Sequence, residues 1–182
     1  MTRMSAEAAD AYRQPMLDAL GRDDPFEVQA GEMDLWRRLL EAAGANLRTR
    51  PAESEWSVIE CLGHMVDSEL ITSTRYRWVM AEDEPALQSY DQEAWTARFD
   101  HAHDDPALLL DLLCALRNAN LALWNRSTPA DRARTGMHAE RGPESLELLF
   151  RLQAGHGRVH RAQAEQALAQ VRRVKWLSQP YG

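Results

Sequence analysis

Two histidines near the end of the chain, His156 and His160, are four residues apart in a segment with helical periodicity. This spacing puts both imidazoles on one face of a helix, about one turn apart, where they can bind a single metal ion. A helical wheel places them among apolar residues, on the side that faces the core. Inward-facing imidazoles need partners, because an unpaired buried polar group is costly. A metal ion would be one partner, and hydrogen bonds to carbonyls or to Gln153 and Gln163 would be another.

A third histidine, His64, lies in another helical segment, and Asp67 follows it on nearly the same line of that helix. Three histidines from two helices, with water or substrate in the open positions, would form a catalytic rather than a structural metal site. Taken alone, however, a single helical histidine is more often hydrogen-bonded or exposed than a ligand. Asp67 could orient a ligand imidazole or accept a proton during catalysis. The competing interpretation pairs Asp67 with an arginine.

The residues around the histidine pair exclude two kinds of metal site. Gly157 stands where zinc proteases with the H-E-x-x-H motif carry their glutamate base, so hydrolysis by that motif is excluded. No E-x-x-H pair occurs in the sequence, which excludes the carboxylate-bridged di-iron site of ferritin-like bundles. Gly155 and Gly157 each weaken a helix by about 1 kcal/mol relative to alanine. They indicate that close packing or access was required near His156, or that two helices cross closely there.

The remaining histidines are expected on the surface. His101 and His103 stand beside two aspartates at the start of a predicted helix, where a solvated cap is expected rather than a second metal site. His138 lies in a loop flanked by glycines and is expected to be exposed. Three arginines could attract an acidic cosubstrate, although charged helix faces are usually solvated: Arg75, Arg77 and Arg117.

The elements that must position these side chains are all predicted to be helical. Ala, Leu, Glu, Arg and Gln dominate long stretches, and the period-2 alternation of a strand is absent. Cap residues bound four long helices, at about 24–47, 57–80, 105–124 and 142–173. Asp24-Pro25, Asp105-Pro106 and Gly142-Pro143 mark three of the starts, and a capping box of Ser57 and Glu60 marks the other. Weaker patterns favour a further helix over 6–20 and a helical turn over 128–131.

Residues 81–104 form a connection that is too long for a bare turn, so it is either a crossover or a lid. Tyr90, Asp91 and Trp95 within it could cover the metal, but anchoring of a surface loop is the favoured interpretation. The sequence thus predicts an all-α fold, a four-helix bundle with one long connection between the second and third helices. This architecture commonly holds metals and cofactors between facing helices.

Composition narrows the function classes. The 182 residues include 45% hydrophobic and 27% charged residues, with a formal charge of −7, which argues against nucleic acid as the main partner. Two cysteines exclude a disulfide scaffold, and the start of the chain has no apolar signal core. The most apolar stretch, Leu108–Leu116, is too short to span a membrane. We expect a cytoplasmic protein with one domain over 1–182 and a bundle core over about 25–172.

Several motifs in order resemble one family. The segments W-S-V-I-E at 56–60 and G-H-M-V-D-S-E at 63–69 resemble the first signature of the DinB-like superfamily, a set of bacterial helical-bundle metalloproteins. Later elements are similar to the same family: Y-D-Q-E-A-W at 90–95, Gly142 with Ser145-Leu146, and H-G-R-V-H-R at 156–161. Their order and spacing extend the resemblance from about residue 25 to 172.

The resemblance implies an up-down-down-up bundle that holds one divalent ion of nickel, zinc or iron. The implied ligands are His64 from the second helix and His156 and His160 from the fourth. Characterised relatives are mostly transferases and isomerases that use thiols such as bacillithiol or mycothiol. The implied function is therefore a transferase in which a metal-activated thiolate attacks a small electrophile. A metal-dependent hydrolase and a non-catalytic stress-response or scaffold bundle stay open, and the family also implies a homodimer.

Overall fold

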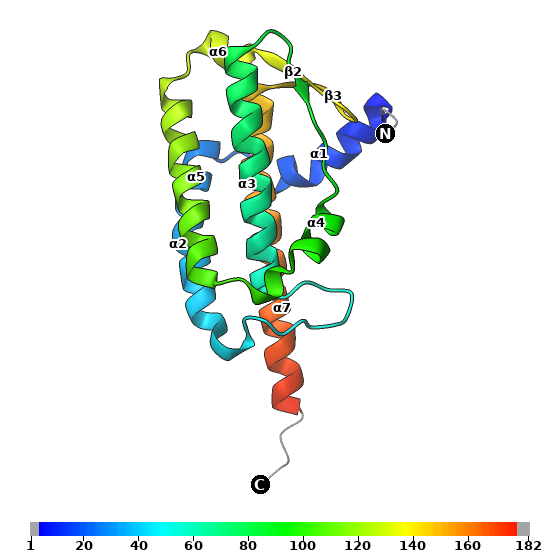
Figure 1. Cartoon of the computed structure of the whole chain (residues 1–182), viewed down its shortest axis with the longest axis vertical. Coiled ribbons are helices and arrows are strands. Elements are labelled where there is room, and N and C mark those ends of the chain that lie inside the picture. Colours follow the sequence, from blue (N-terminus) through cyan, green and yellow to red (C-terminus); the bar gives the residue numbers. More distant parts are fainter. Residues whose placement is uncertain (1–3, 178–182) are drawn as a thin grey trace.

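The computed structural model of the chain describes residues 4–177, so the outer residues of the predicted domain, 1–3 and 178–182, lie outside it. Four long helices enclose the core (Figure 1). They are α2 Pro25–Ala43, α3 Val58–Ala81, α5 Pro106–Arg126 and α7 Leu146–Leu177. Both α2 and α3 pack against α5 and α7, and buried residues such as Trp36, Leu62 and Leu113 fill the space between them. The predicted four-helix bundle is confirmed.

The path of the chain explains its long connection. In Figure 1, α2 and α7 run in one direction while α3 and α5 run in the other, which gives the up-down-down-up order. Because α3 and α5 are parallel, the chain must return along the 24 residues of α3, about 36 Å, before α5 begins. The connection holds the short strand β1 Ala86–Leu87, helix α4 Gln92–Phe99 and the 3₁₀ turn η2 His101–His103. It is a crossover with structure of its own.

The helix starts predicted from cap residues are largely correct. Asp24 accepts hydrogen bonds from two backbone amides of α2, and Asp105 does the same for α5. Glu60 accepts from both the amide and the hydroxyl of Ser57 at the start of α3. The C-terminus of α2 is earlier than predicted, because Gly44 at φ +49° ends the helix and a 3₁₀ turn, η1 Gly44–Asn46, follows.

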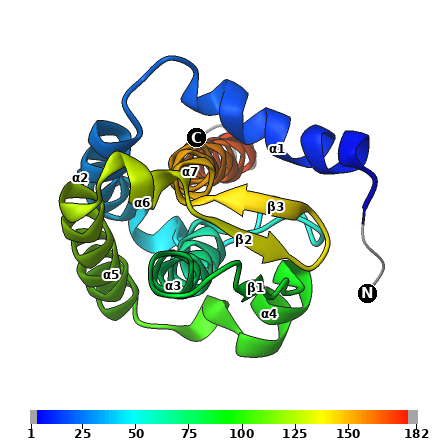
Figure 2. The same cartoon turned by 90° about the horizontal axis from the view of Figure 1, so that it is seen from above.

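The prediction that the chain has no strands is wrong. Strand β2 Thr135–His138 pairs antiparallel with β3 Gly142–Ser145 and parallel with β1, and this small sheet lies across one end of the bundle (Figure 2). Strands of two to four residues are too short to show a period-2 pattern. The predicted start of the last helix at Gly142 is therefore also wrong. Gly142 has φ +79° and begins β3, and Ser145 caps α7 by accepting from the Leu148 amide.

Two further predicted helices are present, α1 Ala6–Leu20 and the short α6 Pro129–Ala133. Helix α1 crosses α7 at Gly155, where a Cβ atom would lie 1.8 Å from the Met16 carbonyl oxygen, so the crowded crossing is the correct interpretation of that glycine. Within residues 4–177, α5 is long and apolar enough to cross a membrane by length and composition. The apolar stretch considered in the sequence, Leu108–Leu116, is only part of this helix and is by itself too short to span a membrane. In the fold, α5 is one of the four bundle helices and exposes Leu108 and Leu112.

Candidate metal centre

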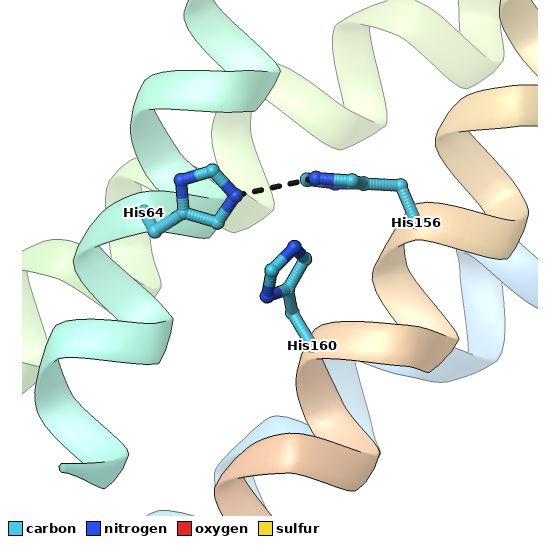
Figure 3. Close-up of side chains that lie close together, drawn as sticks. All are labelled: His64, His156 and His160. Carbon is cyan, nitrogen blue, oxygen red and sulfur yellow. Dashed lines mark hydrogen bonds between the residues drawn. The ribbon is translucent and has the colours of Figure 1, made fainter. Parts of the chain in front are cut away.

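Three histidines from two helices converge inside the bundle (Figure 3). His64 lies in the second turn of α3, and His156 and His160 lie one turn apart on the neighbouring α7. The Nε2 atoms of His64 and His156 are 3.2 Å apart. One ring nitrogen from each of the three residues lies within 4.8 Å of the other two. The structure therefore brings together the three residues that the family resemblance implies as ligands of one ion.

The spacing of one pair of these nitrogens fits a divalent cation. Two nitrogens bound to a tetrahedral zinc ion at about 2.05 Å would lie about 3.3 Å apart. The observed Nε2 separation of 3.2 Å between His64 and His156 agrees with that value. Imidazole nitrogens suit zinc, nickel and iron alike, and a set of three protein ligands leaves room for water or substrate.

The outer nitrogens of two of these rings have partners that orient them. Nδ1 of His160 donates to Oε1 of Gln163 at 2.8 Å, and Nδ1 of His156 lies 3.4 Å from the Ser68 hydroxyl. Ser68 in turn donates to Oε1 of Gln153. A proton on each Nδ1 leaves the Nε2 lone pair free to bind a metal. Of the two glutamines considered from the sequence, Gln163 bonds to a site histidine directly, while Gln153 reaches His156 only through Ser68. Both arrangements are compatible with metal binding.

Burial keeps the three imidazoles neutral. The pKa of His64 is lowered to about 3, chiefly by burial and also by the neighbouring His160 and His101. The pKa values of His156 and His160 also lie below the usual value, chiefly because of burial. Nδ1 of His64 is buried and has no hydrogen-bond partner among the described residues. The neutral form is the one that binds a metal ion, so the site is prepared for one.

Asp67 has a partner that the sequence did not indicate. Its Oδ2 lies 2.9 Å from Nε2 of His101, and Nδ1 of the same ring lies 2.7 Å from Oδ2 of Asp104. Within residues 4–177, Asp67 has neither the arginine partner nor the direct hydrogen bond to a site histidine that the sequence suggested. The expected solvation of His101 is wrong, because the residue is buried, whereas His103 is exposed as expected.

A buried polar network lies behind the histidines. Glu69 accepts hydrogen bonds from Arg117, Asn120 and Gln153. Gln153 also accepts from Ser68, so the network reaches the partner of His156. The structural role expected for Glu69 is consistent with this packing. The sequence indicated Gln153 only as a possible partner of the histidines and gave no signal for Asn120, because the network forms only when three helices pack together.

Comparison with known proteins identifies the family. The family model described as the DinB superfamily matches residues 27–164, which include all three histidines and Asp67. This chain belongs to the DinB superfamily. The resemblance seen in its motifs is therefore confirmed.

Relatives of this DinB chain carry names that refer to metals. A protein of Geobacillus kaustophilus, 28% identical over 154 residues that cover 76% of this chain and 85% of its own, is provisionally named a metal-dependent hydrolase. YfiT of Bacillus subtilis, 26% identical over 143 residues that cover 71% of this chain and 78% of YfiT, bears the same provisional name. The solved structure of YfiT covers 97% of this chain and 93% of its own, with a TM-score of 0.71 and 25% identity. It is described as "a probable metal-dependent hydrolase with an unusual four-helix bundle topology".

A cavity of about 340 Å³ lies beside His156 in this DinB bundle. The crossover supplies one wall through Tyr90, Asp91, Gln92 and Glu93, and α3 and α7 supply others. Gln92 and Glu93 also line a smaller hollow of about 170 Å³ beside His160. The start of α4 therefore lies between the openings on the two sides of the histidine cluster.

The two interpretations of the crossover each describe part of it. Tyr90 and Asp91 line the cavity beside His156, as a cover would. Trp95 instead packs between Tyr90 and Phe99, with ring centroids 4.7 and 5.2 Å away, and lines a separate surface hollow. Trp95 anchors the crossover, while the residues just before it face the cavity.

Proposed function

We propose that this DinB protein is a divalent-metal enzyme that joins a low-molecular-weight thiol to a small electrophile. His64, His156 and His160 would hold the ion. The observation that carries the proposal is the convergence of three neutral imidazoles next to a cavity large enough for a small molecule. The names of the relatives support the ion, but the reaction that they name is hydrolysis and not thiol transfer.

The residues of the chain have separable roles in this proposal. Gln163 and Ser68 orient two of the imidazoles, and Trp56 packs beside two of them, with centroids 5.1 Å from His64 and 6.0 Å from His160. When bound, a divalent ion lowers the pKa of a thiol or a water molecule that binds to it and so supplies a nucleophile at neutral pH. In the transfer, the carbon–sulfur bond forms while the leaving group departs with its electron pair, and the thiol proton is released to a base or solvent.

The surroundings of the histidines favour a thiol over water as the nucleophile. A free thiol has a pKa near 8.5, so it needs much less activation than water. The nearby carboxylate Asp67 is engaged with His101, and no described carboxylate forms a hydrogen bond to the three site histidines. Hydrolysis is the second candidate, and the names of the relatives favour it.

Metal loading tests the site itself. The purified chain is stripped with a chelator, loaded separately with zinc, nickel or iron, and analysed for bound metal. Wild type should bind one ion per chain, and His156→Ala should lose it. His103→Ala is the matched control, because that imidazole is exposed and far from the cluster in sequence. Equal substoichiometric metal in wild type and His156→Ala would contradict the site and leave a scaffold bundle.

Turnover tests the reaction. The loaded protein is incubated with a panel of small thiols and an alkylating electrophile, and loss of the thiol is measured beside hydrolysis of a small ester. Metal-dependent thiol consumption that disappears in His156→Ala is expected. Ester hydrolysis alone would favour the second candidate. Stoichiometric metal without either reaction would contradict the enzyme and favour a non-catalytic metal-binding protein.

A further inference from the structure

Arg75 on α3 is a buried cation without a carboxylate partner in the described part of the chain. The residue is 7% exposed and lines the cavity beside His156. Its Nη2 donates to the Gln88 carbonyl, while its Nε is buried and has no hydrogen-bond partner within residues 4–177. The other buried arginine of the bundle, Arg117, is paired with Glu69. A buried guanidinium that lacks a counter-ion needs one to offset the loss of its hydration.

The ring of His138 places a second hydrogen-bond donor next to the guanidinium of Arg75. Its Nδ1 accepts from the backbone amides of Glu140 and Arg141, both at 3.2 Å, so the proton of the neutral ring lies on Nε2. The other tautomer would point its proton at two amide donors. Nε2 lies 3.3 Å from Nη2 of Arg75, and neither nitrogen can accept from the other. The pair is satisfied only when an acceptor binds both.

The burial and the protonation of His138 agree with its role as a hydrogen-bond donor toward Arg75. The ring is buried, although an exposed position was expected from its glycine-flanked sequence. Burial, with the nearby Arg141 and Arg75, lowers its pKa to about 4, so the ring is neutral at pH 7. A neutral ring with its proton on Nε2 is a hydrogen-bond donor toward Arg75 and carries no charge of its own.

The unpaired positive charge of Arg75 can be neutralised by a ligand with a single negative charge. Arg141 also lines this cavity. Arg141 and its neighbour Arg13 share Glu144, at 2.7 and 3.2 Å, and Arg13 also pairs with Asp10 at 3.2 Å, so two carboxylates match these two arginines. Glu144 is fully buried and its two oxygens are occupied by these arginines. Arg75 therefore keeps an unmatched positive charge, which fits a carboxylate better than a doubly charged phosphate.

The cavity connects this point with the histidine cluster. Ser68, Thr72 and Arg75 line it from one face of α3, at i, i+4 and i+7. Ser68 contacts His156, and seven residues of helix separate Ser68 from Arg75, which is a rise of about 10 Å. A molecule that reaches from the histidines to Arg75 has the length of a short peptide or an amino-acid conjugate.

We propose that Arg75 and His138 form a carboxylate-binding subsite, with Nε–H of Arg75 and Nε2–H of His138 as donors. One reactant of the enzyme then carries a carboxylate about 10 Å from its reacting atom. This second statement rests on the proposed function, whereas the subsite itself requires no metal and no reaction.

Nuclear magnetic resonance of the metal-free full chain tests the subsite. The probes are hexanoate and its uncharged analogue hexanamide, and the readout is the Nε–H resonance of Arg75. Hexanoate should shift this resonance in a saturable manner, while hexanamide should not. An equal response to both probes, or no response to hexanoate, would overturn the proposal. Inorganic phosphate is the third probe, and tighter binding of phosphate at the same resonance would also overturn the carboxylate assignment.

Substitutions of Arg75 and His138 test where hexanoate binds. Arg75→Gln should weaken hexanoate binding at least tenfold, because it removes a charged hydrogen bond to the anion. His138→Phe should also weaken it while the guanidinium is retained. Arg38→Gln is the matched control, since it removes the same charge from an exposed position on α2. Unchanged affinity for hexanoate in Arg75→Gln or in His138→Phe would overturn the subsite. If one variant fails to fold, the comparison of hexanoate with hexanamide on the wild-type protein still tests the proposal.

Turnover experiments separate this inference from the proposed function. With an active preparation, carboxylated reactants should have a lower KM than their amides, and Arg75→Gln should remove the difference by raising the KM for the carboxylated reactants. Pairs in which the thiol or the electrophile carries the carboxylate show which reactant uses the subsite. An active enzyme without such a preference would contradict the reactant assignment alone. Carboxylate binding at Arg75 in a protein without turnover would contradict the proposed function and leave the subsite.

Discussion

The ring of His101 lies against the backbone of Gly63, the residue that precedes His64. A Cβ atom at position 63 would lie 2.2 Å from Cγ of His101. Cγ is at the base of the ring, so the whole side chain would have to move, together with its contacts to Asp67 and Asp104. The glycine beside the site histidine is therefore what allows His101 to reach Asp67.

Gly63→Ala should destabilise the protein by about 1–3 kcal/mol, because an extra methyl group is forced into a filled space. The measurement is the free energy of unfolding in urea. Gly31→Ala is the control, since Gly31 also lies in a long helix but no described atom lies within 4 Å of the place that its Cβ would take. That variant should gain up to about 1 kcal/mol. Equal effects of the two substitutions would contradict the contact.

Asp67→Asn should lower the pKa of His101, because the hydrogen bond with Asp67 is the main cause of its raised value. A histidine with a raised folded pKa stabilises the protein fully below its unfolded value of about 6.5, and this stabilisation is lost as pH rises through the folded value. The advantage of wild type over Asp67→Asn should thus be largest in mildly acidic solution. Proton titration of His101 and urea unfolding at several pH values measure both effects. An unchanged His101 titration would refute the pairing.

A larger rate loss in Asp67→Asn than in His101→Gln would show that Asp67 has a catalytic role of its own.

Gln163→Leu should weaken metal binding 10- to 100-fold, since it removes the acceptor that orients His160. Competition with a chromophoric chelator measures the affinity. Gln166→Leu, three residues further along α7 at an exposed position, is the control and should bind as wild type does. If both variants keep full affinity, the orientation of His160 does not depend on Gln163.

Acid should unfold the metal-free protein through its histidine cluster. The unfolded chain protonates these residues near pH 6.5, whereas the folded state keeps His64 neutral down to about pH 3. The free energy of unfolding should therefore fall as pH falls below 6.5, by up to about 1.4 kcal/mol per pH unit for each such histidine. His64→Gln should reduce this slope, and His103→Gln, which alters an exposed ring, should not. Identical slopes in all three proteins would contradict the buried neutral state of His64.

Local signals predicted the bundle well. Caps such as Asp24, Ser57 and Asp105 act within one helical turn, so the sequence shows them directly. The i, i+4 spacing of His156 and His160 likewise fixes their shared face before any tertiary contact forms. The DinB motifs added His64, whose position opposite the pair depends on how α3 and α7 pack.

Long-range contacts could not be predicted in the same way. His138 is buried because a short hairpin folds over the end of the bundle, and that hairpin depends on the left-handed Gly142 and on the buried Glu144. His101 is buried because Gly63, 38 positions earlier, leaves space for its ring. Neither partner is visible from spacing along one helix. The same limit applies to Arg75, whose lack of a counter-ion appears only when its neighbours are placed.

The parallel arrangement of α3 and α5 has a consequence for the divergence of such proteins. The crossover that it requires forms one wall of the cavity, but carries none of the three clustered histidines. Insertions or substitutions at positions such as Tyr90 can therefore remodel which molecules fit, while the ligand-bearing helices stay as they are. One wall of the cavity is thus inherited on a stretch of the chain separate from the histidines, so that wall can evolve without disturbing the cluster.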